Sequence, residues 1–261
     1  MKNTNLQKFL LLPSLFGFCF FYVFPFIKVL KYAFFDNSFT EKFVGIDNFK
    51  QLLSSDYFML AMKNTFIFTA IGVPTLIIFS LILAFLIANM INKISFVQKS
   101  IFLPFLLPSA TVVAFWQAFF SEVPPFSSLL AVYLWKHIGL VVMLLLSAIS
   151  TLDTDMLEAA KIDGAGRLKT IISVCIPNIT PTLLFSIILS FVNSLKIYRE
   201  SYLLYGNYPD KNIYMLQNYL NNHFDKLNYQ NISAAAIIVF ALVYAVVGVA
   251  LALEKKVSCH L

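Results

Sequence analysis

The stretch "NTFIFTAIGVPTLIIFSLILAFLIANMIN", residues 64–92, contains no charged side chain. A helix needs about 20 mostly apolar residues to cross a bilayer, whereas a strand of a membrane barrel needs only about ten alternating ones. This run is continuous and too long for such a strand, so it predicts a transmembrane helix. The composition agrees, because 59% of the 261 residues are apolar and only 12% are charged. The sequence therefore predicts a membrane protein.

Comparable apolar runs recur along the whole chain and predict an all-α polytopic membrane protein with six transmembrane helices in one domain, 1–261. A polar loop over 151–178 separates the fourth helix from the fifth. Lys136 and His137 interrupt the fourth run, which we interpret as a span that carries a polar site. The predicted helices cover 9–32, 64–91, 100–121, 127–150, 179–201 and 232–253.

Basic residues in the short loops predict the orientation of the helices. With a cytoplasmic N-terminus, the inner segments hold nine Lys and Arg residues and the outer segments seven. Because cytoplasmic loops carry the excess of Lys and Arg, both termini and the 151–178 loop are expected in the cytoplasm. The first apolar run exceeds a signal-peptide core and lacks a small-x-small cleavage site, so we expect a retained helix.

Several functional classes have no support in the residues. The chain contains no G-x-x-x-x-G-K-[ST] phosphate loop, so ATP binding by this chain is not expected. Its three histidines lack metal-ligand spacing, and no catalytic set of side chains shares one membrane level. The net charge of +6 comes from residues scattered at helix ends rather than from a stripe, which argues against nucleic acid binding. Three separated cysteines predict no disulfide.

The polar loop contains the segment "EAAKIDGAG", residues 158–166, which predicts a short capped helix. Asp155 is expected to cap its N-terminus, with Glu158 as the reciprocal partner of a capping box. Gly164 is expected to end the helix, because glycine adopts the left-handed conformation that follows a helix C-terminus. A helix of this kind also has a purely structural interpretation, in which it anchors the bundle to the lipid headgroups.

The spacing within and after this segment is more specific than the capping pattern. Glu158-Ala159-Ala160, three residues, Gly164, nine residues and Val174-x-Ile176-Pro177 match the pattern E-A-A-x3-G-x9-I-x-L-P with aliphatic exchanges only. This pattern resembles the coupling loop of permease subunits in binding-protein-dependent ABC importers. The continuation "IDGAG" resembles the carbohydrate-uptake branch, which includes the maltose and glycerol-phosphate permeases.

The resemblance extends over nearly the whole chain. One departure is the connection "SEVPPFSSLL", residues 121–130, which is shorter than in such permeases, so contacts made there by relatives cannot be transferred. The similar stretches are "FVGIDNF" (43–49), "LPFLLPSA" (103–110), "IYRESYLL" (197–204) and "IYMLQNYLNNHF" (213–224).

The resemblance implies a type I ABC importer permease fold in the bacterial inner membrane. It also implies two ABC ATPase subunits that bind ATP and Mg²⁺, a second and different permease subunit, and an extracellular or periplasmic solute-binding protein. This chain itself would bind no cofactor and would have no enzymatic activity. The residues implied in coupling to the ATPase are Glu158, Ala159, Ala160, Asp163, Gly164 and Pro177.

Polar and aromatic residues at the outer ends of the middle helices are candidates for a solute pathway, because ionisable residues at membrane depth are usually functional. Three- and four-residue spacing places those of the fifth helix on one face. Snorkelling of Lys and Arg to the outer surface explains the same positions. The candidates are Trp116, Gln117, Trp135, Lys136, Asn193, Lys196, Arg199 and Glu200.

Three functional hypotheses follow from these observations. The first is the permease subunit of an ATP-driven importer for a sugar or related solute, either neutral or anionic. The second is a stand-alone channel or secondary transporter, for which the sequence shows no convincing inverted repeat. The third is a polytopic membrane enzyme, which the missing catalytic groups disfavour.

The predicted orientation is testable by cysteine labelling from outside the cell. Because the inner loops carry the excess of Lys and Arg, a membrane-impermeant reagent should reach cysteines engineered at Asp47 and Asp210 but not at Lys93 or Lys256. Labelling of the Lys93 position from outside would overturn the orientation.

Overall fold

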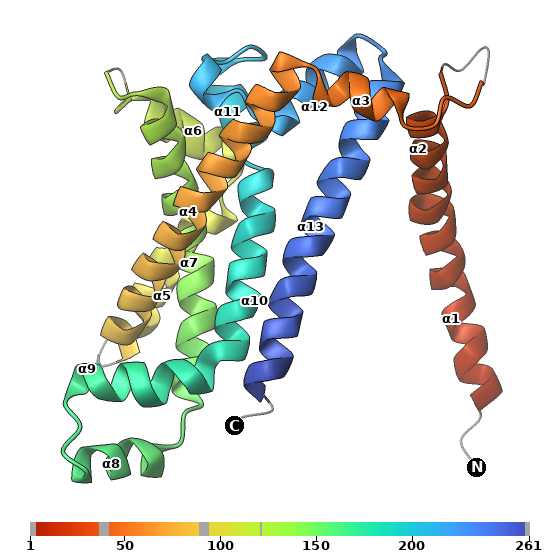
Figure 1. Cartoon of the computed structure of the whole chain (residues 1–261). Coiled ribbons are helices and arrows are strands. Elements are labelled where there is room, and N and C mark those ends of the chain that lie inside the picture. Colours follow the sequence, from red (N-terminus) through yellow and green to blue (C-terminus); the bar gives the residue numbers. More distant parts are fainter. Residues whose placement is uncertain (1–3, 37–41, 89–93, 121, 259–261) are drawn as a thin grey trace. The chain divides into compact units, whose positions relative to one another are not determined.

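The computed structural model describes residues 4–36, 42–88, 94–120 and 122–258. Within these ranges every named element is a helix, and β pairing is limited to one isolated bridge between Phe35 and Phe43 (Figure 1). The predicted all-α class is therefore confirmed. The chain divides into two compact units, Met1–Met59 with Tyr219–Leu242 and Leu60–Asn218 with Val243–Leu261, and each is described by itself.

Five helical runs of the described residues are long and apolar enough to cross a membrane, and a bent pair of shorter helices makes a sixth. This number agrees with the six predicted spans. The five runs are Leu11–Phe34, Asp56–Ala88, Pro125–Ser150, Arg167–Tyr205 and Tyr229–Ala252, and the bent pair is Phe96–Leu106 with Ser109–Gln117.

The first run is interrupted by a π-helical turn. Helix α1 (Thr4–Phe18) leads into the π-helix Cys19–Val23, and α2 (Phe24–Phe34) follows. Pro25 has no N–H to donate to an α-helical carbonyl, and its ring crowds the preceding turn. The wider π turn directly before it, closed by Phe24 N–H to the Cys19 carbonyl, accommodates this defect.

The third predicted helix, 100–121, is not one helix. Helix α5 (Ile94–Leu106) ends and α6 (Ser109–Gln117) begins after two residues, and their axes bend by 99°. Pro108 causes this break, because the residue before a proline is excluded from the α conformation and Pro108 itself is extended at φ −58° and ψ 144°.

The fifth predicted helix, 179–201, is longer at its start and broken near its end. Helix α9 (Arg167–Thr170), the π-helix Ile171–Cys175 and α10 (Ile176–Leu195) form one run. Lys196 and Ile197 interrupt it before α11 (Tyr198–Tyr205). The π turn precedes Pro177, as in the first run, and Figure 1 shows the run changing direction between α9 and α10.

Helix α7 (Pro125–Ser150) is the centre of the larger unit, where it packs against α5 and α10. The Tyr133 hydroxyl donates to the Ser190 carbonyl of α10 at 2.8 Å, and its ring meets Phe68 of α4 (Asp56–Ala88) edge-on. Gly139 lies where α5 crosses α7. An added Cβ there would stand 2.0 Å from the Ile101 carbonyl oxygen, so only glycine permits this close approach.

Helix α4 begins eight residues before its prediction because Asp56 supports its first turn, where a carboxylate favours the helix dipole. The end of its predicted range, 89–91, and Lys93 lie outside the described residues. Asn64 Nδ2 of α4 donates to the carbonyls of Lys211 and Tyr214, and Thr65 Oγ1 accepts from Leu216 N–H. These bonds hold the 3₁₀ turn Lys211–Ile213 and the start of α12 (Leu216–Asp225) against α4.

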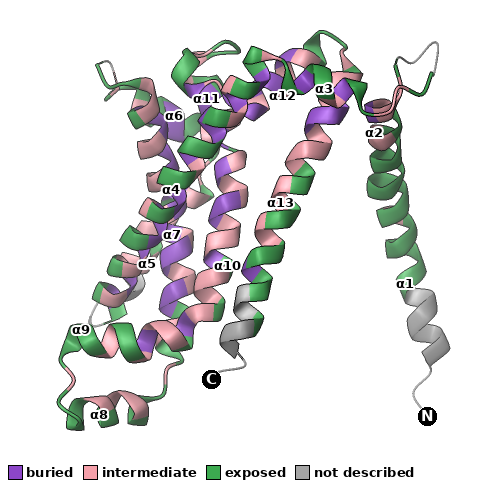
Figure 2. Cartoon of the chain, in the orientation of Figure 1, coloured by how far each residue is buried: buried purple, intermediate pink, exposed green. Residues whose placement is uncertain are grey.

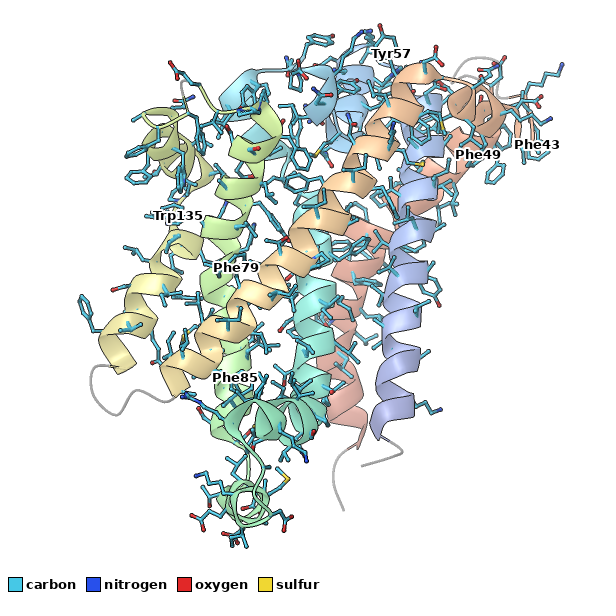
Figure 3. All side chains as sticks on the ribbon, turned by 60° about the vertical axis from the view of Figure 1, so that its left-hand side comes forward. Phe43, Phe49, Tyr57, Phe79, Phe85 and Trp135 are labelled. Carbon is cyan, nitrogen blue, oxygen red and sulfur yellow. The ribbon has the colours of Figure 1, made fainter. Side chains whose placement is uncertain are left out.

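The smaller unit is organised around the stretch that contains Gly45 and Asn48. Gly45 has a φ of +58°, which turns the chain into α3 (Asp47–Leu53). The buried Asn48 amide then donates to the Ala33 and Phe35 carbonyls, which are left free at the end of α2. Phe49 of α3, labelled in Figure 3, packs against the Phe34 ring.

Large apolar side chains remain exposed along the long helices. Figure 2 shows that α2 and the part of α1 from Leu11 onward are mostly exposed, whereas buried residues are frequent along α7. Phe79 of α4, labelled in Figure 3, is 53% exposed, and Phe240 of α13 (Tyr229–Ser258) is 55% exposed. Exposed apolar helices of this length suit a lipid environment.

Gly139 provides a test of the α5–α7 packing. Gly139→Ala should destabilise the protein by about 1–3 kcal/mol or more, because the new methyl group overlaps the α5 backbone and forces the helices apart. Thermal unfolding in detergent or nanodiscs measures this loss. Gly248→Ala is the matched control, since nothing lies within 4 Å of a Cβ there, and it should be neutral. Equal unfolding temperatures for both variants would contradict the close approach.

Candidate functional site

A polar cavity of about 610 Å³ lies in the larger unit, where two helical runs are broken. Residues on both sides of the α5–α6 break line it, as do residues around the α10–α11 break, and α7 and α12 complete the wall. Its lining residues are Phe105, Leu107, Pro108, Ser109, Lys136, His137, Asn193, Lys196, Tyr198, Arg199, Glu200 and Gln217.

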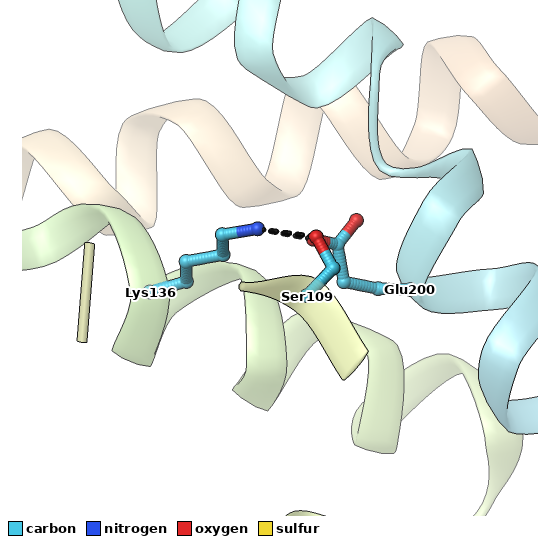
Figure 4. Close-up of polar contacts among 3 residues, drawn as sticks. All are labelled: Ser109, Lys136 and Glu200. Carbon is cyan, nitrogen blue, oxygen red and sulfur yellow. Dashed lines mark hydrogen bonds and ion pairs between the residues drawn. The ribbon is translucent and has the colours of Figure 1, made fainter. Parts of the chain in front are cut away.

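A hydrogen-bonded ion pair lies in this wall (Figure 4). Lys136 Nζ of α7 is 2.5 Å from Glu200 Oε1 of α11. It also donates to Ser109 Oγ at 2.7 Å, and that hydroxyl donates to Glu200 Oε1 at 2.7 Å. Three elements therefore meet in one cyclic set of contacts.

The pair is largely removed from solvent. The Glu200 side chain is 4% exposed and the Lys136 side chain 14%. Charges buried to this extent are costly unless each has a partner, and here each charge has the other and the Ser109 hydroxyl. The function of the pair in this setting is to fix the positions of α6, α7 and α11 relative to one another.

Five of the eight predicted pathway residues line the cavity: Lys136, Asn193, Lys196, Arg199 and Glu200. The reason given from the sequence, a single face of one helix, is wrong, because α10 ends at Leu195. The helix break still brings these residues to one cavity. Lys196 and Arg199 are exposed, whereas Glu200 is buried.

The other three predicted residues lie elsewhere. Trp135, labelled in Figure 3, stacks on Phe115, and Trp116 meets Trp135 edge-on and stacks on Phe120. Gln117 is exposed and donates weakly, at 3.3 Å, to the Leu203 carbonyl. None of the three is among the residues that line the cavity, so these aromatic side chains pack the α6–α7 contact.

Several lining residues were not predicted. Ser109 and Gln217 lie in stretches that resemble the permease family, 103–110 and 213–224, but they carry no charge and neither was singled out as a site residue. His137 was assigned with Lys136 to a polar site in the fourth span but was not included among the pathway candidates. It is buried in α7, and its Nδ1 atom has no hydrogen-bond partner among the described residues.

The predicted helix in the polar loop is present as α8 (Thr154–Ile162) (Figure 1). Its N-cap is Asp153, whose carboxylate accepts from Asp155 N–H at 2.9 Å. The predicted Asp155–Glu158 capping box is therefore wrong. Asp153 lies two residues before Asp155, so the third helical position is Met156 and Glu158 is too far along to close the box. Glu158 is exposed and forms no ion pair within the described part of the chain.

The C-terminal end of α8 matches the prediction. Gly164 has a φ of +73°, its N–H donates to the Lys161 carbonyl, and Ala165 N–H donates to the Ala160 carbonyl. These two bonds form a Schellman motif. Just before it, Ile162 is 86% exposed, and Asp163 is exposed as well. Pro177 lies at the start of α10, not in this turn.

Sequence comparison assigns the chain to a family. Residues 62–258 match the profile of the binding-protein-dependent transport system inner membrane component. The chain belongs to this family. It is therefore a multi-pass transport subunit of the bacterial inner membrane and not an enzyme.

Two named relatives match most of the chain. The chain is 28% identical to the multiple sugar-binding transport system permease protein MsmF of Streptococcus mutans, over 95% of this chain and 94% of that protein. It is 26% identical to the sn-glycerol-3-phosphate transport system permease protein UgpA of Pectobacterium atrosepticum, over 73% of each.

A solved structure confirms the permease fold. The crystal structure of a bacterial alginate ABC transporter in complex with an alginate pentasaccharide-bound periplasmic protein contains a chain with a TM-score of 0.84. The two chains are 20% identical, and the match covers 98% of this chain and 96% of that one. The expected type I ABC importer permease fold is thus present.

The buried ion pair is testable by a double-mutant cycle. Lys136→Met should cost about 3–5 kcal/mol of stability, because it leaves the Glu200 carboxylate buried without its partner. Adding Glu200→Met should recover most of that loss, since no buried charge then remains. Chemical denaturation in nanodiscs measures both. Additive losses in the double variant would show that the two side chains do not interact.

Proposed function

We propose that the chain is the membrane-spanning permease subunit of an ATP-driven importer. It translocates a sugar or related solute that an extracellular solute-binding protein delivers. Membership of the family supports the import role, and relatives such as MsmF and UgpA are sugar and glycerol-phosphate permeases. No observation favours the stand-alone transporter or channel.

The observation that carries the proposal is the exposed end of α8. A Schellman motif holds this end rigidly, and it presents the Glu158 carboxylate, the small Ala159 and the apolar Ile162 away from the rest of the unit. A fixed helix end that carries an exposed apolar side chain and an exposed carboxylate can contact a partner through both groups. We infer that α8 docks on an ABC ATPase subunit, where Glu158 pairs with a basic side chain.

In this proposal, two such ATPase subunits bind ATP and Mg²⁺, and all residues that contact the nucleotide or the metal ion belong to those subunits. A second, different permease subunit completes the membrane part of the importer. Closure of the ATPases then moves the paired permeases between inward-open and outward-open states, which is a rigid-body form of alternating access.

One nearly continuous helical run connects the end of α8 to the cavity. After the Gly164 turn, α9, the π turn and α10 lead to Lys196, which lines the cavity. A displacement of α8 by the ATPase is therefore delivered along α10 to the residues that line the cavity. The broken span α5–α6 faces the same cavity and supplies the second moving wall.

A substitution at Gly164 tests the proposed coupling to the ATPase without affecting membrane insertion. Gly164→Val should disrupt the Schellman turn, because a β-branched residue at a φ of +73° is strained by about 1–3 kcal/mol. The variant should insert and fold normally but should lose most ATPase association, with solute uptake falling together with solute-stimulated ATP hydrolysis. Co-purification and uptake in proteoliposomes measure these effects.

Gly166→Val is the matched control. Gly166 has a φ of −65° and a ψ of 160°, which valine adopts without strain, and nothing lies within 4 Å of its Cβ position. This variant should retain the ATPase. If Gly164→Val transports at the normal rate with its ATPase fully attached, or if no ATPase co-purifies with the unmodified chain, the proposed function is wrong.

A further inference from the structure

The charges that line the cavity do not balance. Lys136, Lys196 and Arg199 carry three positive charges, and Glu200 carries the one negative charge. The contact between Lys136 and Glu200 cancels one charge of each sign. Two cationic side chains, Lys196 and Arg199, are left over.

These two cations have no acidic partner within the described residues. Both are exposed and face the cavity from the α10–α11 break. Both side chains line the same cavity, so one ligand can contact both of them. Two like charges that line one cavity repel each other, and an anion bound between them relieves this repulsion.

The other polar side chains that line the cavity can form hydrogen bonds with a ligand. Asn193, Gln217 and Tyr198 bring amide and phenol groups, which bind the hydroxyls of a sugar. His137 is nine-tenths buried, and its Nδ1 atom lacks a hydrogen-bond partner in the described part of the chain. His137 is among the residues that line the cavity, so its imidazole adds a further hydrogen-bonding side chain to this wall.

The volume limits the size of the ligand. At about 610 Å³ the cavity is in the range of pockets that enclose small organic molecules. Phe105 supplies an apolar ring of the kind that covers the C–H face of a sugar. One or two sugar units fit this description better than a metal ion or a long polymer.

We propose that the cavity binds an acidic carbohydrate, whose carboxylate, sulfonate or phosphate group lies between Lys196 and Arg199. Its hydroxyls bind His137, Asn193 and Gln217. Lys136 does not contribute to charge recognition, because Glu200 already neutralises it. This assignment rests on the proposed import function and narrows its cargo from sugars in general to those that carry an acid group.

The test is a comparison of matched pairs that differ only in the acid group. The pairs are digalacturonate with galactobiose, sulfoquinovose with glucose, and glucose 6-phosphate with glucose. Calorimetry on the assembled importer in nanodiscs, without its solute-binding protein, measures binding. At least one acidic member should bind tenfold or more tightly than its neutral counterpart, since hydrogen bonds to charged groups are strong.

Lys196→Gln and Arg199→Gln should each reduce this preference about tenfold while leaving the neutral sugar unchanged. Lys211→Gln is the matched control, because Lys211 is exposed in the same unit but does not line the cavity. It should retain the full preference. Salt should weaken the binding of the acidic sugar in the wild type more than in either cavity variant.

Three results would overturn the proposal. The first is equal binding of acidic and neutral members in every pair, and the second is a preference that survives in both cavity variants. The third is a loss of solute-binding-protein capture in these variants with the sugar preference unchanged, which would assign the cations to docking of that protein. Each leaves the proposed function intact, because ATPase co-purification and uptake are measured separately.

Discussion

The buried ion pair between Lys136 and Glu200 is the contact on which the cavity depends. A lysine in the interior of an apolar helix is costly unless its ammonium group finds an anion, and that anion comes here from a different element, α11. The Ser109 hydroxyl joins the same contact at the first residue of α6. The interaction therefore fixes the two helix breaks against the one uninterrupted helix between them.

The breaks and the cavity are consequences of the same constraint. In lipid, a helix that stops leaves backbone N–H and C=O groups without partners, and this is tolerated only where protein or a polar cavity replaces lipid. The α5–α6 break at Leu107 and Pro108 and the α10–α11 break at Lys196 both border the cavity. Polar side chains, a cavity and irregular backbone therefore occur together in this unit.

Much of the fold could be predicted because lipid imposes simple rules on the sequence. Long apolar runs, one of them interrupted by Lys136 and His137, identified the six spans. The preference of glycine for positive φ identified Gly164 as the end of α8. The 99° bend was missed, because Pro108 was read as part of a helix rather than as its boundary. The early N-cap at Asp153 was missed because Asp155 and Glu158 also have capping-box spacing, and only the backbone geometry decides between the two aspartates.

The candidate site was only partly predictable from the sequence. Charged residues such as Lys196 and Glu200 stand out in an apolar chain, so their presence at a site was foreseeable. The pairing of Glu200 with Lys136 was not foreseeable, because these two residues lie 64 positions apart and only the fold brings them together. Trp116 and Trp135 illustrate the opposite error, since aromatic residues near polar ones contribute as readily to packing as to a pathway.

The arrangement of α10 connects the two ends of the proposed mechanism. Its run begins next to the exposed α8 turn and ends at Lys196, on the cavity wall. The π turn Ile171–Cys175 and Pro177 and Pro181 weaken the backbone ladder near the start of this run, whereas no described residue of α10 beyond Pro181 is a proline. In the proposed mechanism, bending would be concentrated beside the loop, and the remainder of the helix would move as a rigid unit. A movement of α8 that changes the angle at this point would then displace the far end of α10, next to the break at Lys196 and Ile197.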